Sequence, residues 1–250
     1  MKTLLIKEWK EQWRTHRLLI LLIVFSVFGI LSPLAARFMP AIIENMTTEQ
    51  GIEIKIPDPL WTDAVLQYLK NISQICTFIL IILSMGVIAK EKESGTIIFL
   101  FVKPVRRSSF ILAKFLIQFL SSFIAMLSAS LLCIFYTMIF FGEMDVWAFL
   151  KIHFVLYFFV LIIQSITLFY STLLKSSLTA GLMSFLTWLL LGLLSQLGRV
   201  GQFSPSKLIS EAGNILIGTT MRWEAFAGSA ILLTVLLLIS LWHCSRWETE

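Results

Sequence analysis

The sequence predicts an all-α integral membrane protein with six transmembrane helices, an amphipathic helix at its N-terminal end and a short cytoplasmic helix. Of its 250 residues, 58% are apolar and 14% are charged, and the mean hydropathy is +0.87. Ordinary soluble domains carry about 25% charged residues. The apolar runs are continuous and close to the roughly 20 residues that cross a bilayer as a helix. Because they do not alternate with polar residues, they exclude a transmembrane barrel.

Residues 2–16 are expected to form a helix that lies on the membrane surface. On a helical wheel, an apolar stripe with two tryptophans has a row of basic residues beside it, and Glu8 and Glu11 fall outside both. Such a stripe suits the headgroup layer. The alternative is a cytoplasmic flank with some helical character. The stripe comprises Leu5, Ile6, Trp9 and Trp13, and the basic row comprises Lys7, Lys10, Arg14 and Arg17.

The six spans follow in one domain that covers residues 1–250. The third is long enough to tilt or to project beyond the membrane. Two long connections, 37–71 and 198–224, are expected on the outer side, and apolar stretches in the second predict short helices near the membrane. The spans are expected at about 18–36, 72–89, 110–141, 149–174, 178–197 and 225–243.

The distribution of basic residues predicts that both ends of the chain are cytoplasmic. With the N-terminus inside, the cytoplasmic segments hold 13 of the 20 Lys and Arg residues. Cytoplasmic loops carry an excess of basic residues in membrane proteins. This places the chain in the plasma (inner) membrane and the 90–109 loop in the cytoplasm, where Lys114 flanks the third span.

The 90–109 loop has an unusual order of residues. Glu91 and Glu93 form an acidic cluster where the second span ends, and Gly95 permits a sharp change of backbone direction. Thr96 is suited to cap a short helix that starts at Ile97. The apolar patch that follows ends at Pro104, since the residue before a proline disfavours helix. A short apolar helix at the cytoplasmic surface suits docking into a groove of a soluble partner.

This loop resembles the corresponding loop of type-2 ABC transporter permeases, the six-span exporter subunits that include the nitrous-oxide-reductase maturation permease. The family pattern runs approximately E-[RK]-E-x-G-T-L-E-x-L-L-x-x-P-[VL]-S-R, with a basic residue near the next span. The sequence departs from it at Ile98 and Arg106. The residues in register are Glu91, Lys92, Glu93, Gly95, Thr96, Ile97, Leu100, Pro104, Val105, Arg107 and Lys114.

The resemblance implies a permease subunit of an ATP-binding-cassette exporter. Two permease chains, alike or different, would pair in the membrane, and two separate ATP-binding subunits would bind beneath them. The helix after Gly95 would be the coupling helix that enters a groove of the ATPase. The residues assigned to this coupling are Glu91, Glu93, Gly95, Thr96, Ile97, Leu100, Pro104 and Arg107.

Several motifs are missing from the sequence. It has no G-x-x-x-x-G-K-[ST], H-E-x-x-H or G-x-S-x-G pattern, so we expect no ATPase site, no catalytic residue, no metal and no cofactor in this chain. No nucleic-acid partner is expected, whereas membrane lipid is. Gln118 and Gln164 are candidates for a substrate path, because polar groups inside spans often mark one. The alternatives are a multispan enzyme acting on lipids and an immunity or scaffold protein that works without ATP.

Overall fold

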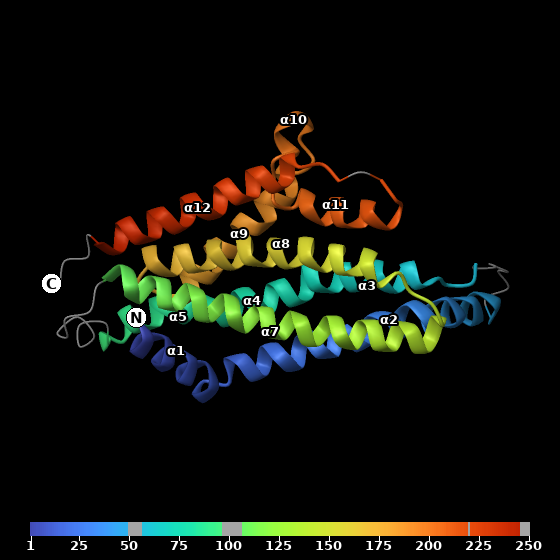
Figure 1. Ribbon diagram of the computed structural model, residues 1–250, viewed down its shortest axis with the longest axis horizontal. Coiled ribbons are helices and arrows are strands. Elements are labelled where there is room, and N and C mark those ends of the chain that lie inside the picture. Colours follow the sequence, from blue (N-terminus) through green and yellow to red (C-terminus); the bar gives the residue numbers. More distant parts are fainter. Residues whose placement is uncertain (50–56, 97–106, 220, 246–250) are drawn as a thin grey trace.

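The structure is a computed structural model that describes residues 1–49, 57–96, 107–219 and 221–245. These residues form an elongated bundle of helices, with no strand among them (Figure 1). Six helices are long and apolar enough to cross a membrane, which confirms the predicted fold class. They are α2 (Arg17–Glu49), the Trp61–Glu93 segment, α7 (Arg107–Phe141), α8 (Val146–Leu173), α9 (Ser177–Leu194) and α12 (Glu224–Ser245).

The first span continues past the predicted end at residue 36. Helix α2 runs to Glu49 with Pro33 and Pro40 inside it, and α3 (Trp61–Asn71) begins well before the predicted start of the second span. The outer connection predicted for residues 37–71 is therefore largely helical. A proline removes one helical hydrogen bond, which flanking helices and polar side chains can replace inside a membrane protein.

The second span is one path made of four short pieces. A π-helical turn, η1 (Ile72–Cys76), separates α3 from α4 (Thr77–Ser84), and α5 (Gly86–Glu93) completes the path. In a π turn the backbone carbonyls bond to the residue five positions later instead of four. Here the Thr77 hydroxyl also donates to the Ile72 carbonyl, at 2.9 Å. No residue pattern in the sequence predicted this turn.

The predicted short helices in the 198–224 connection are present. They are α10 (Gly198–Gly201) and α11 (Lys207–Leu216), and α11 packs on α8 with Leu208 and Ala212 buried. The buried Glu211 carboxylate accepts a hydrogen bond from the backbone of Arg222 at 3.1 Å, which ties this segment to the start of α12.

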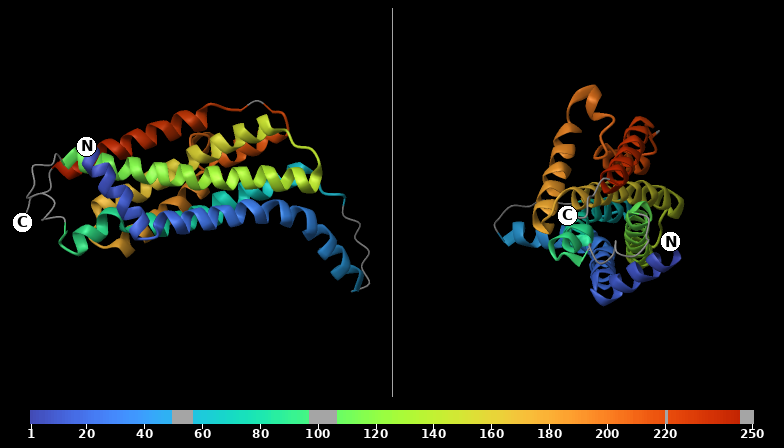
Figure 2. Two further views of the ribbon diagram at one scale, coloured as in Figure 1. Left: turned by 60° about the horizontal axis from the view of Figure 1, so that its bottom comes forward. Right: turned by 90° about the vertical axis from the view of Figure 1, so that its left-hand side faces the viewer.

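Helix α1 (Lys2–Arg14) crosses the end of the bundle beside α7, at a steep angle to the spans (Figure 2). The turn into α2 depends on His16, whose φ of 55° lies in the left-handed region. Histidine adopts this region more readily than most non-glycine residues. The start of α1 and the end of α12 lie at this same end of the bundle (Figure 1), as an even number of spans requires.

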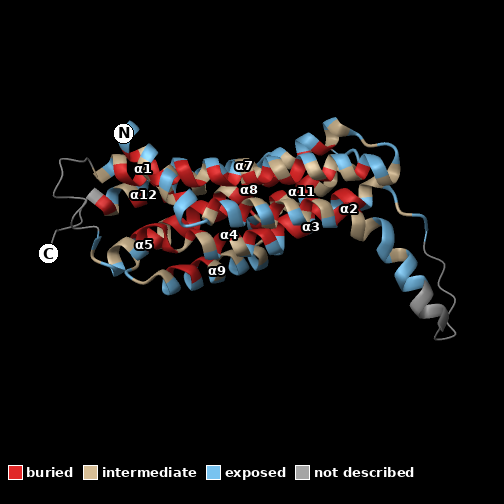
Figure 3. Ribbon diagram, turned by 90° about the horizontal axis from the view of Figure 1, so that it is seen from below, coloured by how far each residue is buried: buried red, intermediate tan, exposed pale blue. Residues whose placement is uncertain are grey.

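The buried apolar residues form a large cluster between the spans and a smaller one around Phe110 and Phe115. The outward-facing positions of the helices are exposed (Figure 3), and many of them are leucine, isoleucine and phenylalanine. At the α2–α7 contact, Gly29 lies against the backbone of Ala129. A Cβ added to Gly29 would stand 2.6 Å from the Ala129 carbonyl oxygen. Small residues let membrane helices approach this closely, so Gly29 sets the distance between α2 and α7.

We expect Gly29→Ala to lower the free energy of unfolding by about 1–3 kcal/mol, because the new methyl group meets backbone that can move only with the whole helix. The measurement is unfolding in mixed micelles by titration with sodium dodecyl sulfate. Gly192→Ala is the matched control: it lies in α9 with no atom within 4 Å of the added Cβ. Equal effects of the two substitutions would show that α2 and α7 are not in close contact.

Candidate functional site

A lysine is fully buried where α1, α5 and α7 meet. Lys114 belongs to the second turn of α7, and its side chain is 0% exposed. Its ammonium group also lies 5.0 Å from the centroid of the Phe110 ring, one turn earlier. A buried ammonium is unstable unless it is paired and hydrogen-bonded, so its neighbours decide whether this end of the bundle can form.

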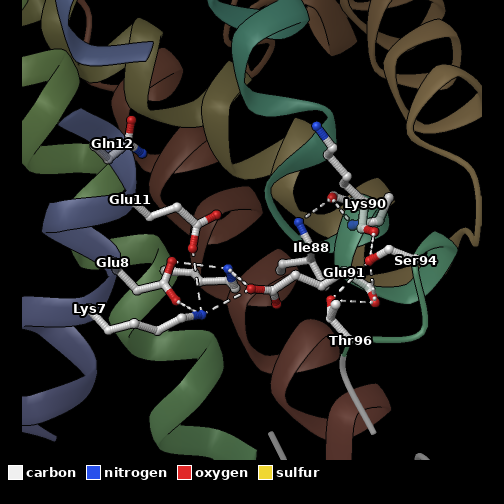
Figure 4. Close-up of polar contacts among 12 residues, drawn as sticks. Lys7, Glu8, Glu11, Gln12, Ile88, Lys90, Glu91, Ser94 and Thr96 are labelled. Carbon is white, nitrogen blue, oxygen red and sulfur yellow. Dashed lines mark hydrogen bonds and ion pairs between the residues drawn. The ribbon is translucent and has the colours of Figure 1, made fainter. Parts of the chain in front are cut away.

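Two carboxylates from different helices pair with Lys114. Its Nζ lies 3.0 Å from Glu8 Oε2 on α1 and 3.1 Å from Glu91 Oε1 on α5. Both carboxylate side chains are largely buried themselves. The pairs therefore join three helices that are far apart in the sequence. Figure 4 shows Lys7, Glu8 and Glu11 of α1 approaching Glu91 of α5 between the helices.

Lys7 adds a second cation to the cluster from its solvent-facing side. Its Nζ lies 3.0 Å from Glu8, 3.1 Å from Glu91 and 3.5 Å from Glu11. Partial burial acts to lower the pKa of Lys7, but the carboxylates of Glu8 and Glu91 outweigh this effect and raise that pKa above its ordinary value. Lys7 therefore stays charged at any physiological pH.

The carboxylate oxygens of Glu8, Glu11 and Glu91 approach within 4.8 Å of one another, as metal ligands do. Lys7 and Lys114 lie among them as cations within ion-pair distance. Two ammonium groups at these distances supply the positive charge that a metal would otherwise bring. The arrangement is that of an ion-pair cluster, which we call the α1–α5–α7 cluster.

The end of α5 is closed by a left-handed glycine. Gly95 has a φ of 69°, and its N–H bonds to the Lys92 carbonyl at 3.1 Å. This is the usual way in which a glycine ends a helix. The Ser94 and Thr96 hydroxyls lie 2.9 Å apart and donate to the carbonyls of Lys90 and Glu91. Thr96 thus caps the end of α5; the predicted helix from Ile97 lies outside the described residues.

The last turn of α5 also contacts the helices on its other side. The Lys92 ammonium donates to the carbonyls of Thr172 and Leu174, at the end of α8. The Glu93 carboxylate accepts from the Ser177 hydroxyl at 3.1 Å, at the start of α9. Together with Glu91, these side chains connect one helical turn to α1, α7, α8 and α9.

A chain of amide hydrogen bonds continues from the cluster into the bundle. Gln12 donates to the Gln118 side-chain oxygen at 2.8 Å, and Gln118 donates to the Ser84 hydroxyl at 2.6 Å. Gln164 donates to the Gln118 carbonyl at 3.0 Å and accepts from Ser122 at 3.0 Å. In the described residues these buried amides join α1, α4, α7 and α8.

The structure places five of the eight residues assigned to coupling. Glu91, Glu93, Gly95 and Thr96 lie together at the end of α5, whereas Arg107 begins α7, where its carbonyl accepts a hydrogen bond from the Cys244 thiol at 3.8 Å. Ile97, Leu100 and Pro104 lie outside the described residues.

Sequence reasoning missed four residues of the cluster, namely Lys7, Glu8, Glu11 and Lys114. It placed Glu8 outside both the apolar stripe and the basic row of the N-terminal helix. In the structure, Glu8 is buried with Leu4 and Gln12 on the face that meets α7. It assigned Lys114 to the charge excess beside the third span and to the basic position of the family pattern, and not to a buried ion pair. The available signal was the spacing of Leu4, Glu8 and Gln12, which repeats every fourth residue.

Comparisons with known proteins agree with this architecture. Residues 2–203 match the family model described as ABC-2 family transporter protein. An uncharacterized transmembrane protein of Bacillus subtilis (strain 168), YxlG, is 29% identical over 119 residues, which cover 47% of this chain and 46% of that protein. The chain thus matches about half the length of this relative.

We expect Lys114→Met to lower the free energy of unfolding by about 3–5 kcal/mol, because it leaves the Glu8 and Glu91 carboxylates buried without this cation. The measurement is again unfolding in mixed micelles. Adding Glu8→Gln and Glu91→Gln to Lys114→Met should recover part of the loss, since no buried charge then remains unpaired.

The control is Lys7→Met, the same substitution in the same cluster at a side chain that is 40% exposed. Partly solvated ion pairs contribute little, so we expect a loss below about 1 kcal/mol. If both lysines gave the same loss, burial of the Lys114 pair would not be what stabilises this end of the bundle.

Proposed function

Because this chain belongs to the ABC-2 family of transporter proteins, we propose that it is the membrane-spanning permease subunit of an ATP-driven exporter. The family supplies the membrane component of an ABC transporter and implies ATP-binding partners. Beyond the family, we propose that two permease chains pair and that two separate ATPase subunits attach at the end of the bundle where α1 begins and α12 ends. The likeness to the nitrous-oxide-reductase maturation permease remains part of this proposal and depends on the loop motif.

The observation that carries the proposal is the set of contacts made by the last turn of α5. Its side chains reach α1 and α7 through Glu91, α8 through Lys92 and α9 through Glu93. The chain leaves this turn directly into the segment proposed to dock on the ATPase. A force on that segment would therefore act on four helices at once, which a transport cycle requires.

In this proposal, the coupling residues divide into two groups. Glu91 and Glu93 point toward other helices of this chain, so they act by positioning α5 rather than by touching the ATPase. Ile97, Leu100, Pro104 and Arg107 remain the proposed contact residues. Gly95 lies between the groups and provides the turn from one to the other.

The proposed cargo is amphipathic or apolar, such as a peptide, a lipid or a drug. The spans carry few ionisable residues, and the outer connections are too short to form a large binding domain. Gln118 and Gln164 remain candidates for the substrate path. Their amides are hydrogen-bonded between helices, so a role in transport would require these bonds to exchange during the cycle.

We expect Gly95→Val to reduce transport-linked ATP turnover at least about tenfold while the chain still inserts in the membrane. A β-branched residue is strained at a φ of 69°, so the docking segment would leave α5 in another direction. Gly95→Asn is the matched control, because asparagine tolerates this conformation. The measurement is ATP turnover of the complex purified through a tag on the full chain.

Two results would count against the coupling role. One is equal turnover for Gly95→Val, Gly95→Asn and the unmodified chain; the other is a purified, fully active assembly that contains no ATP-binding subunit. The second result would favour an enzyme or an ATP-independent binding protein instead.

We also expect both ends of the chain to be cytoplasmic. Single cysteines at Thr3 and Thr249, in a chain without its three native cysteines, should resist an impermeant thiol reagent in intact cells and react after lysis. Trp147→Cys, at the opposite end of the bundle and 76% exposed, should react in intact cells. The reverse pattern would invert the topology.

A further inference from the structure

A cleft of about 800 Å³ lies between α1 and α5, on the outside of the α1–α5–α7 cluster. It is found where the apolar part of α2 begins and the apolar part of the second span ends, which is headgroup depth in a membrane. Its charged lining is mostly basic. The lining cations are Lys7, Lys10, Arg14, Arg17 and Lys90, and the lining anions are Glu11 and Glu91.

The acidic side chains beside the cleft share two ammonium groups, because Lys7 and Lys114 face the three carboxylates of Glu8, Glu11 and Glu91. Glu91 pairs with Lys7 and Lys114 through one oxygen, and Glu11 lies 3.5 Å from Lys7. The other four cations of the lining, Lys10, Arg14, Arg17 and Lys90, form no ion pair within 4.0 Å in the described part of the chain. The lining holds five cations and two anions, so the cleft presents an excess of positive charge, although the carboxylates of Glu11, Glu8 and Glu91 also act on Arg17.

Arg17 is the most informative of these cations, because it is partly buried rather than extended into solvent. It makes neither a hydrogen bond nor an ion pair with any described residue. One of its terminal nitrogens lies 3.7 Å from the position that a Cβ of Gly86 would occupy, so the absence of a side chain there leaves room over the start of α5. A guanidinium held in this way is suited to bidentate contact with a phosphate.

A second cleft of about 640 Å³ continues from the first toward the apolar zone. The two share Thr15, Arg17, Gly86, Lys90 and Ser94 in their linings. The second is also lined by Ile82, Leu83 and Met85, and Ile82 is 44% exposed. Its remaining lining residues are Glu93 and Ser177, whose carboxylate and hydroxyl are hydrogen-bonded to each other at 3.1 Å. A basic, hydroxyl-bearing chamber thus opens into an apolar groove. An anionic head attached to a hydrocarbon chain would match both parts.

We propose that this double cleft binds one anionic phospholipid. Its phosphate lies between Arg17 and Lys90, and one acyl chain follows Ile82 and Met85. The bound lipid packs beside the last turn of α5 and links it to α1. The proposal needs no ATPase and no particular orientation of the chain, so it stands or falls separately from the transport function.

The test is native mass spectrometry of the full chain in detergent, titrated with phosphatidylglycerol or with phosphatidylcholine of the same acyl chains. We expect one phosphatidylglycerol to bind at least about tenfold more tightly than phosphatidylcholine. Lys90→Gln should weaken this binding about fivefold, and Arg17→Gln with Lys90→Gln about 25-fold, since each basic residue near a lipid headgroup contributes about a factor of five.

Lys2→Gln is the matched control, because Lys2 is exposed on the same helix α1 but does not line either cleft. We expect it to leave phosphatidylglycerol binding unchanged. Lys90 is itself exposed, so Lys90→Gln should fold normally even if Arg17→Gln does not. An equal loss for Lys2→Gln and Lys90→Gln, or no loss for either, would overturn the site.

A third arm separates the lipid from a free phosphate. Inorganic phosphate and soluble glycerol 3-phosphate at millimolar concentration should not displace phosphatidylglycerol, because they cannot occupy the apolar groove. Displacement by either compound would assign the cleft to a soluble phosphate ligand and overturn the lipid proposal.

Discussion

The structure at one end of this bundle depends on the burial of a single ammonium group. Lys114 lies inside an apolar helix, and a buried charge is tolerated only when it is paired and hydrogen-bonded. The partners come from α1 and from the end of α5, so Lys114 satisfies its charge only when both elements are in place. Hydrophobic burial alone does not fix the positions of helices relative to one another in a membrane, because lipid is as apolar as the helix surfaces.

This constraint gives the last turn of α5 a special position. On one side Glu91 belongs to the α1–α5–α7 cluster, and on the other side Lys92 and Glu93 bind the end of α8 and the start of α9. Gly95 then ends the helix in a conformation that few other residues tolerate. A rigid turn with partners on four helices, followed at once by a change of direction, is an efficient point at which a force from a soluble motor would enter the membrane domain. A lipid in the adjoining double cleft would act on the same turn.

The fold was predictable from the sequence, because six long apolar runs and an amphipathic start leave few alternatives in a membrane. The details that were missed have physical reasons. A proline usually ends a helix, yet α2 continues through Pro40 and beyond the predicted end of the first span at residue 36. The π turn at Ile72–Cys76 has no residue signature. Glu8 and Lys114 looked like surface charges because the sequence does not show that α1 and α7 cross. The crossing of these two helices is what brings the two side chains together as a buried ion pair.

The most direct test of this central claim is the distance between α1 and α5, measured by pulsed electron resonance on spin labels at Lys2 and Lys90 in a cysteine-free chain. Both positions are exposed, and neither belongs to the α1–α5–α7 cluster. We expect a narrow distance distribution with Lys114 present, and a broad one in Lys114→Met, since α1 then loses its buried partner. A distribution of the same width in both chains would contradict the claim that the Lys114 ion pairs hold α1 against the end of α5.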